Sequence, residues 1–162
     1  MTMAKFEDDF LTIQEFKKIH QNMHNSSFPW FYNSSVAEPD KDDGIYFNHC
    51  FYFDNQVRSD YFEFLEPVLK KLKVKSLMTV KANLYPQTKE LIKHGLHRDQ
   101  DFNCKSALLM MNSCDGYTYL KEIDSKIESV ANRVVHFNSY IPHHSTTTTN
   151  EKVRLTININ YF

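Results

Sequence analysis

The sequence lacks any long hydrophobic segment and any excess of charge of one sign. Its longest apolar run, residues 107–111, is far shorter than the ~18 residues that a membrane span requires. Residues 1–9 include three acidic side chains, and no apolar stretch typical of a signal peptide follows them. The 19 Lys+Arg and 20 Asp+Glu give a formal net charge of −1. Composition therefore gives no reason to expect an anionic membrane or a nucleic acid as a partner.

Cysteine, glycine and arginine are also scarce. The three cysteines, Cys50, Cys104 and Cys114, contain no C-x-x-C pair, and an odd number cannot all pair within one chain. We therefore expect reduced thiols in the cytoplasm, or in the host cytoplasm if a phage encodes the protein. Three Gly and an excess of 15 Lys over four Arg suit an A/T-rich genome such as that of a phage, while histidine is abundant at eight residues.

The length and the apolar content predict a single domain spanning residues 1–162. With 41% hydrophobic and 14% aromatic residues, a chain of 162 residues can bury a substantial core. Residues 1–74 predict supporting helices and strands. A capping-box pattern at Thr12 and Glu15 opens a helix over 13–25, strands follow at 28–32 and 45–53, and a helix broken near Pro67 covers 59–72.

From residue 75 onward the pattern changes to short β segments. They are predicted at 77–85, 106–112, 117–120, 126–130, 134–137 and 153–161, with Asp115-Gly116 and Asn132-Arg133 as turn dipeptides. Regularly spaced short strands favour a sandwich or a barrel. The fold class predicted for the chain is therefore mainly β with supporting α-helices, and residues 75–162 form its core.

The last predicted strand has one apolar and one polar face. Its apolar positions, 153, 155, 157, 159 and 161, alternate with Arg154, Thr156, Asn158 and Asn160. The polar face could lie in water, as in many antiparallel sheets, or it could line a pocket inside a barrel. The predicted strand 77–85 has the same pattern, because Lys81, Asn83 and Tyr85 share one side.

A second pattern indicates a metal site. His97 and Asp99 are two residues apart, so an extended chain places both side chains on one side. A further imidazole is available at either His143 or His144. Two imidazoles and one carboxylate form the facial triad of non-haem Fe(II) oxygenases, which leaves coordination positions open for a 2-oxo acid and O₂. Arg154 follows on the polar face of the last strand, where it could bind the far carboxylate of 2-oxoglutarate.

About half of the chain resembles a known family. The segments that carry the resemblance are 81–86 (Lys-Ala-Asn-Leu-Tyr-Pro), 94–99 (His-Gly-Leu-His-Arg-Asp), 115–120 (Asp-Gly-Tyr-Thr-Tyr-Leu), 132–137 (Asn-Arg-Val-Val-His-Phe), 141–144 (Ile-Pro-His-His) and 154–161 (Arg-Leu-Thr-Ile-Asn-Ile-Asn-Tyr). In their order and spacing they are similar to the 2-oxoglutarate/Fe(II)-dependent oxygenases, in particular to the prolyl-hydroxylase-like branch and its small phage and bacterial members. The resemblance implies a double-stranded β-helix, the jelly-roll fold shared with the cupins.

The resemblance also implies roles for individual residues. His97 and Asp99 match the first two iron ligands, and Arg154 matches the partner of the 2-oxoglutarate C5 carboxylate. The distal histidine of the family commonly lies six residues after a Phe that here is Phe137, which favours His143 over His144.

Three more matches follow from the same alignment of motifs. Tyr85 matches a tyrosine that helps to bind the co-substrate, and Asn83 matches an asparagine of the Asn-x-Tyr pattern. Gly116 and Thr118 match a Gly-x-Thr turn and strand whose role is mainly structural. The remaining histidines are expected to pack in the core or lie on the surface: His20, His24, His49, His94 and His136.

The function implied is that of a dioxygenase that uses Fe(II), 2-oxoglutarate and O₂ to hydroxylate a C–H bond and releases succinate and CO₂. The prime substrate could be a protein side chain, a peptide or a small metabolite, contacted by the loops 33–44, 87–95 and 145–152. The alternative is a non-catalytic jelly-roll module that binds a metal or ligand without turnover.

Overall fold

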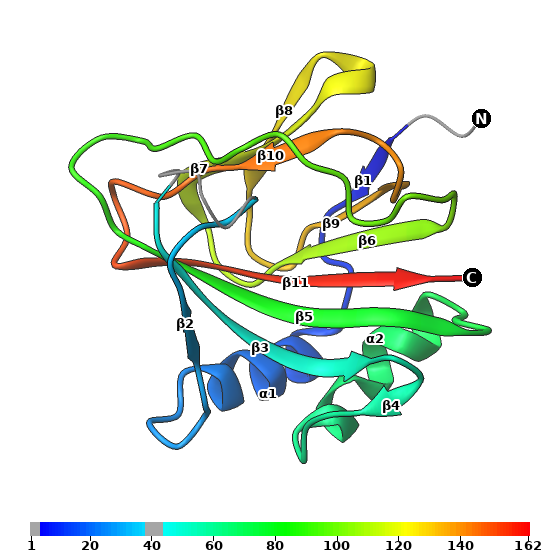
Figure 1. The fold of residues 1–162 in the computed structure, drawn as a ribbon. Coiled ribbons are helices and arrows are strands. Elements are labelled where there is room, and N and C mark those ends of the chain that lie inside the picture. Colours follow the sequence, from blue (N-terminus) through cyan, green and yellow to red (C-terminus); the bar gives the residue numbers. More distant parts are fainter. Residues whose placement is uncertain (1–3, 38–43) are drawn as a thin grey trace.

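The structure is a computed structural model that describes residues 4–37 and 44–162. Two antiparallel sheets face each other, and the helices lie against the outer face of the larger sheet (Figure 1). Within the described residues, no helix is long and apolar enough to cross a bilayer. Residues 38–43 of the loop 33–44, which was expected to contact substrate, lie outside the described residues.

The larger sheet carries most of the chain. Its strands run in the order β1 (Lys5–Glu7), β9 (Val134–Asn138), β6 (Lys105–Met110), β11 (Val153–Tyr161), β5 (Leu77–Pro86), β3 (Tyr46–Phe53) and β2 (Phe31–Asn33), with β4 (Gln56–Val57) pairing with β3. The smaller sheet has the order β10 (His143–Ser145), β7 (Cys114–Leu120) and β8 (Ser125–Ser129). Two facing antiparallel sheets of this kind confirm the predicted jelly-roll.

The helices follow the sequence closely. Helix α1 (Ile13–Met23) begins with the predicted capping box, in which the Thr12 hydroxyl accepts from the Glu15 N–H and the Glu15 carboxylate accepts from the Thr12 N–H. The predicted broken helix consists of a 3₁₀ turn η1 (Phe62–Leu65) and helix α2 (Glu66–Lys71), with Pro67 in the first turn of α2. A further 3₁₀ turn, η2 (Lys121–Ile123), links β7 to β8.

The alternation along β11 places its apolar side against the helices. Leu155, Ile157 and Ile159 are at most 1% exposed and share one core with Ile19 of α1 and Val68 of α2. Full burial of each such side chain stabilises the fold by about 1.5–3 kcal/mol. The polar side of β11 consequently faces the smaller sheet. Of the two alternatives for that face, the structure shows the interior pocket.

A second apolar core fills one part of the space between the sheets. It consists of Leu108, Met110, Leu120, Ile127, Val135, Phe137 and Ile141. Strand β6 contributes to both cores, because Ala107 and Leu109 face the helices while Leu108 and Met110 face the smaller sheet. The rest of the space between the sheets is lined by polar side chains and holds the candidate site.

Four strands and one turn differ from the sequence-based prediction. The short strands β1, β4 and β10 were not predicted, because two or three residues are too few to show a periodicity. Strand β2 begins at Phe31 rather than residue 28, beyond Pro29, which has no N–H to donate. The expected Asp115-Gly116 turn is wrong: both residues lie inside β7, where the pairing register shifts between Cys114 and Tyr117.

Candidate active site

Three predicted metal ligands lie together at the mouth of the space between the sheets. One ligand atom from each of His97, Asp99 and His143 lies within 4.8 Å of the other two. The two histidines belong to segments that pair through their backbones, because the N–H of each donates to the carbonyl of the other at 2.9 Å. The Asp99 N–H donates to the carbonyl of Ser139 at 3.1 Å. Backbone pairing therefore fixes where all three side chains start.

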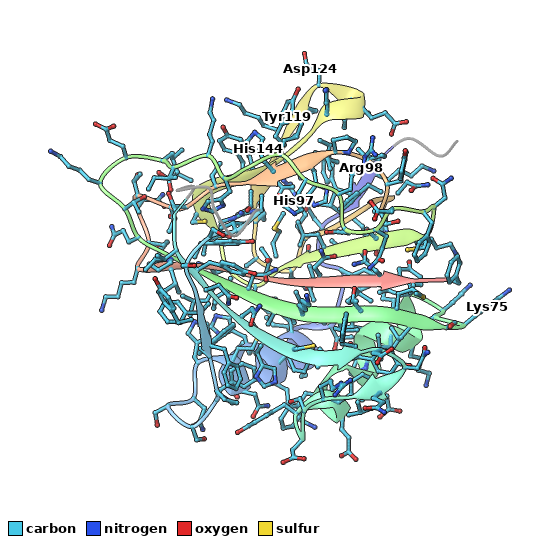
Figure 2. All side chains as sticks on the ribbon, viewed as in Figure 1. Lys75, His97, Arg98, Tyr119, Asp124 and His144 are labelled. Carbon is cyan, nitrogen blue, oxygen red and sulfur yellow. The ribbon has the colours of Figure 1, made fainter. Side chains whose placement is uncertain are left out.

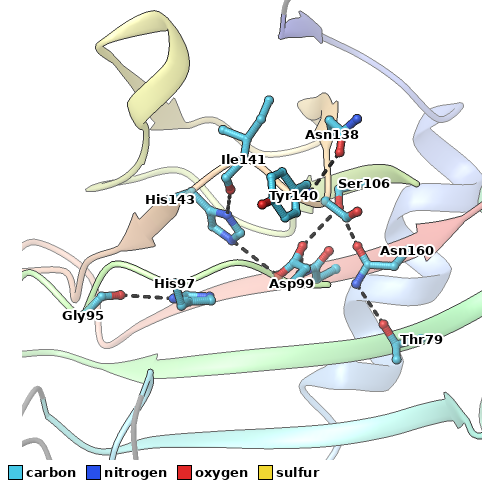
Figure 3. Close-up of polar contacts among 12 residues, drawn as sticks. Thr79, Gly95, His97, Asp99, Ser106, Asn138, Tyr140, Ile141, His143 and Asn160 are labelled. Atoms are coloured by element: carbon cyan, nitrogen blue, oxygen red, sulfur yellow. Dashed lines mark hydrogen bonds and ion pairs between the residues drawn. The ribbon is translucent and has the colours of Figure 1, made fainter. Parts of the chain in front are cut away.

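Backbone carbonyls also orient both imidazole rings (Figure 3). The Nδ1 atom of His97 lies 3.0 Å from the carbonyl of Gly95, and Nδ1 of His143 lies 2.9 Å from the carbonyl of Ile141. A carbonyl only accepts, so each Nδ1 must carry the proton. In a neutral ring this leaves the Nε2 lone pair for a metal, the arrangement in which a hydrogen bond behind the ligand sets its tautomer.

The Asp99 carboxylate is held from behind by the polar face of β11. Its Oδ2 accepts from Asn158 Nδ2 at 3.0 Å and lies 3.1 Å from Ser106 Oγ. The Ser106 hydroxyl also lies within hydrogen-bond distance of Asn160 Oδ1, and Asn160 in turn donates to Thr79 Oγ1 at 2.8 Å (Figure 3). The opposite oxygen, Oδ1, faces His143.

Asp99 and His143 form an ion pair. His143 Nε2 lies 3.4 Å from Asp99 Oδ1, and both side chains are 7% exposed. Burial raises the pKa of the Asp99 carboxyl, but the hydrogen bond and charge of His143 outweigh burial and leave that pKa lowered. Burial likewise lowers the pKa of His143, but Asp99 outweighs it and the pKa is raised. His143 thus provides the positive charge next to Asp99 that a bound metal ion would otherwise provide.

The structure separates His143 from His144. Strand β10 alternates, so His144 points away from the cluster, toward the outer side of the smaller sheet (Figure 2). Its ring stacks on Tyr119 with centroids 5.1 Å apart and contacts Tyr117 edge-on at 6.0 Å. Burial lowers the pKa of His144. The position favoured by the family spacing, His143, is the one that meets His97 and Asp99.

A polar cavity of about 220 Å³ extends from this cluster into the space between the sheets. Its lining is dominated by hydrogen-bonding and charged side chains: Tyr46, Lys81, Asn83, Tyr85, His97, Arg98, Asp99, Thr118, His143, Ser145, Arg154, Thr156 and Asn158, with Val36 and Leu108. Strands β5 and β11 line it with three directly opposed pairs, Tyr85–Arg154, Asn83–Thr156 and Lys81–Asn158. The Lys81–Asn158 pair lies at the metal end and the Tyr85–Arg154 pair at the far end.

Arg154 is fully buried at that far end, with 0% of its surface exposed. Its Nε donates to Ser129 Oγ at 2.7 Å, Nη2 to Thr118 Oγ1 at 2.8 Å and Nη1 to the Thr146 carbonyl at 3.2 Å. All three acceptors are neutral. Among the residues that the structure describes, no carboxylate pairs with this guanidinium. Burial lowers the pKa of Arg154, yet an arginine stays charged in proteins, so the cavity ends in an uncompensated cation.

Glycine at position 116 makes room for this arginine. A Cβ there would lie 2.6 Å from Arg154 Cδ and 2.5 Å from the carbonyl oxygen of Thr147. Both distances are shorter than any real Cβ contact, and the second atom belongs to the backbone. Gly116 and Thr118 of the Gly-x-Thr pattern are therefore part of the anchor for Arg154 and do more than shape a turn.

Tyr85 and His94 complete the wall beside the arginine. The Tyr85 ring lies 5.6 Å from the Arg154 guanidinium and stacks on His94 with centroids 4.9 Å apart. His94 Nδ1 lies 2.7 Å from Ser145 Oγ, and Ser145 also hydrogen-bonds Tyr85. Burial raises the pKa of the Tyr85 phenol, which therefore keeps its proton and can donate a hydrogen bond. His94 supports the pocket wall and lies outside the metal cluster, as expected.

Sequence reasoning placed six residues at the site and missed several that support them. All six candidates line the one cavity: Asn83, Tyr85, His97, Asp99, His143 and Arg154. Ser106 and Ser129 were missed, because a serine inside a β segment has no distinguishing pattern. Asn158 could have been found, since it shares the polar face of β11 with Arg154.

Several solved structures have the same fold as this chain. No protein-family model and no curated protein matches the sequence. A prolyl hydroxylase from Trichoplax adhaerens, in complex with a hypoxia inducible factor oxygen degradation domain peptide, superposes with a TM-score of 0.71 at 17% identity, over 98% of this chain and 83% of that chain. The chain has the fold of the 2-oxoglutarate/Fe(II) oxygenases.

Two further structures show the same oxygenase fold. An oxidoreductase of the 2OG-Fe(II) oxygenase family from Burkholderia pseudomallei matches with a TM-score of 0.72 at 11% identity, over 98% of this chain and 84% of that chain. A viral collagen prolyl hydroxylase from Paramecium bursaria Chlorella virus-1, solved with 2-oxoglutarate, matches with a TM-score of 0.67 at 12% identity, over 98% and 95%. The resemblance inferred from the motifs is confirmed at the level of fold.

The donor set of the site fits the metal that such a fold implies. Two imidazole nitrogens and one carboxylate oxygen suit Fe(II) with open positions, and a cluster without thiolates does not resemble a closed structural zinc site. The uncompensated Arg154 fits a dicarboxylate whose other end reaches the metal. The residues present therefore fit both groups.

Proposed function

We propose that the protein is an Fe(II)- and 2-oxoglutarate-dependent dioxygenase that hydroxylates a C–H bond of a protein side chain, a peptide or a small molecule. The balanced reaction takes a C–H substrate, O₂ and 2-oxoglutarate to the C–OH product, succinate and CO₂. One observation carries the proposal: a fully buried Arg154 with neutral partners ends the same cavity that begins at the His97, Asp99 and His143 cluster.

The protein contributes metal binding and orientation. His97 and His143 would bind Fe(II) through Nε2, and Asp99 through the oxygen that now faces His143. Bound there, the iron supplies the redox chemistry that couples oxidative decarboxylation of a 2-oxo acid to hydroxylation. Asn158 and the carbonyls behind the two imidazoles hold the three donors in their present orientations.

Arg154 would bind the C5 carboxylate of 2-oxoglutarate. Three of its five N–H groups donate to oxygens of Ser129, Thr118 and Thr146, which fixes the plane of the guanidinium. A fourth, on Nη2, meets only the weak acceptor Met110 Sδ at 3.9 Å, so this N–H and the second one on Nη1 are the two that a carboxylate can take. Two parallel hydrogen bonds to a carboxylate are the geometry for which arginine is suited. Tyr85 lies on the same wall and can donate its phenol proton to the same carboxylate, while Asn83 lines the middle of the cavity.

The alternative, a non-catalytic module, is not favoured by this geometry. A module that binds a metal alone would have no use for a second charged site at the far end of the cavity, and a buried cation without a carboxylate partner destabilises a fold. We also place the activity in the cytoplasm, which the three free cysteines, Cys50, Cys104 and Cys114, support.

An anaerobic titration tests the proposed function. Fe(II) and 2-oxoglutarate together should give the weak visible charge-transfer band of the chelate, and admission of O₂ should then yield succinate. Arg154→Gln serves as the matched control, because it keeps the metal ligands and removes the cation. A folded protein that shows neither the band nor succinate would contradict the proposal.

A further inference from the structure

We infer that the prime substrate carries a carboxylate or phosphate group, which Lys81 and Arg98 bind beside the metal ligands. The inference rests on the proposed function and extends it to the class of substrate. It starts from two cationic side chains that line the cavity and that the metal and 2-oxoglutarate leave without a counter-charge.

Lys81 lies on the inner face of the larger sheet, next to Asn158, which holds the Asp99 carboxylate. On β5 it stands directly opposite Asn158 of β11, and Asn158 donates to Asp99. Directly opposed residues in antiparallel strands have Cβ atoms about 4.5–5.5 Å apart, so the lysine stem starts beside the metal end of the cavity. Lys81 is half-buried, and its described contact is the ring of Phe53, 5.7 Å from Nζ. No acid among the described residues pairs with it.

Arg98 brings a second cation to the same mouth. It lies between two metal ligands in the chain, so their backbone pairing also fixes its position. Its guanidinium carbon lies 3.9 Å from the centre of the Tyr140 ring, and a stacked guanidinium keeps its edge N–H groups available for an anion. The described residues supply no carboxylate partner for Arg98 either.

The charges of the metal, the co-substrate and the residues that bind them cancel one another. Fe(II) with two positive charges, Asp99 with one negative, 2-oxoglutarate with two negative and Arg154 with one positive sum to zero. Among the described residues that line the cavity, Lys81 and Arg98 are then the charges without a counter-charge. Arg98 is exposed and Lys81 is half-buried. An anionic group on the substrate would neutralise both, and such charge-assisted hydrogen bonds are about twice as strong as neutral ones. A neutral substrate would have to desolvate Lys81 without replacing its water.

The test measures anion binding to protein that cannot turn over. Protein saturated with Zn(II) and 2-oxoglutarate is titrated by NMR with malonate, methyl phosphate and the neutral malonamide. Saturating 2-oxoglutarate occupies both Arg154 and the metal, so an additional anion must bind at a different site. We expect malonate or methyl phosphate to bind with a Kd of about 1 mM or tighter and malonamide not to bind. The two anions distinguish a carboxylate from a phosphate as the source of the charge.

Variants locate the bound anion. Lys81→Met should weaken binding roughly tenfold, and Lys81→Arg should restore it, because one charge-assisted hydrogen bond is lost and then replaced. Arg98→Met should weaken it as well. Lys105→Met is the matched control, since Lys105 is exposed on β6 and does not line this cavity.

Each outcome is decisive. If no anion binds to the loaded protein, if malonamide binds equally well, or if Lys81→Met leaves the Kd unchanged, the substrate-class inference is wrong while the proposed function stands. If 2-oxoglutarate itself fails to bind to the Zn(II) protein, the proposed function fails and this inference fails with it. If Lys81→Arg does not restore the anion binding that Lys81→Met loses, the substrate-class inference is wrong as well.

Discussion

At the metal end of the cavity the negative charge of Asp99 is matched by His143 and supported by Asn158. At the far end, the described hydrogen-bond partners of the positively charged Arg154 are three neutral oxygens and the sulfur of Met110. Asn158 supports the metal end and Arg154 forms the far end, and both side chains lie on the inner side of β11, four residues apart. The metal end can exchange its internal ion pair for a bound cation. The far end has no internal substitute and holds its charge ready for an anion.

This difference teaches how the two ends respond to mutation. The metal end depends on the direction in which each donor atom points, so changing a single side chain there removes a ligand outright. The far end depends on a permanent charge and on the space that the chain leaves for it. Variants at the metal end should therefore lose metal affinity, and variants at the far end should lose co-substrate affinity.

The sharpest test of the metal end compares two adjacent histidines. His143→Ala removes one of three ligands, and we expect Fe(II) affinity to fall more than about 100-fold. His144→Ala, on the outer side of the same strand, should leave the affinity within a factor of about two. Metal titration by calorimetry or by the spectrum of bound Co(II) measures both. The reverse result would move the distal ligand to residue 144.

The far end should lose the co-substrate but keep the metal. Arg154→Gln is expected to weaken 2-oxoglutarate binding about 100-fold, since two charge-assisted hydrogen bonds are lost, while Fe(II) affinity stays unchanged. Arg154→Lys should fall between, because a point charge replaces a two-pronged donor. Unfolding by urea should show no loss of stability in Arg154→Gln, because it removes an uncompensated buried cation. Equal 2-oxoglutarate affinity in all three proteins would refute the anchor.

Gly116→Ala tests the space around the anchor. A methyl group at this position would meet Arg154 Cδ and the Thr147 carbonyl, and we expect a loss of about 1–3 kcal/mol in the free energy of unfolding. The displaced guanidinium should also bind 2-oxoglutarate roughly tenfold less tightly. Cys114→Ala, two residues earlier in β7, is the control and should change stability far less. An unchanged Gly116→Ala protein would show that the arginine tolerates movement.

The smallest effect concerns Asp115, which fixes the loop beside the anchor. Its carboxylate accepts from the Thr149 N–H at 2.8 Å and from the Thr148 hydroxyl at 2.9 Å. Burial raises the pKa of Asp115, but these hydrogen bonds together outweigh burial and lower the pKa to about 2. Because the unfolded value is about 3.9, the carboxylate stabilises the fold above that pH and loses this contribution as the pH falls toward 2.

Asp115→Asn should therefore lose stability at pH 6 and lose less than the unchanged protein on going from pH 6 to pH 2.5. Urea unfolding at the two pH values measures the difference. Asp101→Asn, an exposed carboxylate elsewhere, is the control and should leave that pH dependence unaltered. A parallel pH dependence in Asp115→Asn would show that the hydrogen bonds to the loop contribute nothing.

The candidate metal ligands and the polar face of the last strand could be predicted from the sequence, whereas the serine residues that hydrogen-bond to them could not. Alternation along β11 was visible as a pattern, and so were His97 and Asp99, because a spacing of two residues has a direct meaning in an extended chain. The choice of the interior for the polar face was not visible, since it depends on the smaller sheet covering it. The same holds for Ser106 and Ser129, whose partners are far away in the chain and near only after both sheets have formed.

Short and irregular elements set the other limit. Strand β10 has three residues, yet it decides between His143 and His144, and no periodicity can be read from three positions. The residues Asp115 and Gly116 have the composition of a turn, but in the structure they lie where the pairing register of β7 and β8 shifts. Only the pairing with β8 shows that β7 continues through them.

Arg154 lies on a strand and faces inward, and this restricts the positions along β11 at which an anchoring arginine could be placed during evolution. Inward positions recur at every second residue, so an anchor on β11 can move only in steps of about 6.6 Å, and a shift by one residue would turn the arginine into the helix-packed core. A step of that size exceeds the length added by a single carbon–carbon bond several times over. If the proposed co-substrate binds as inferred, adapting the site to a dicarboxylate with one carbon more or less would require a new anchor on a different element.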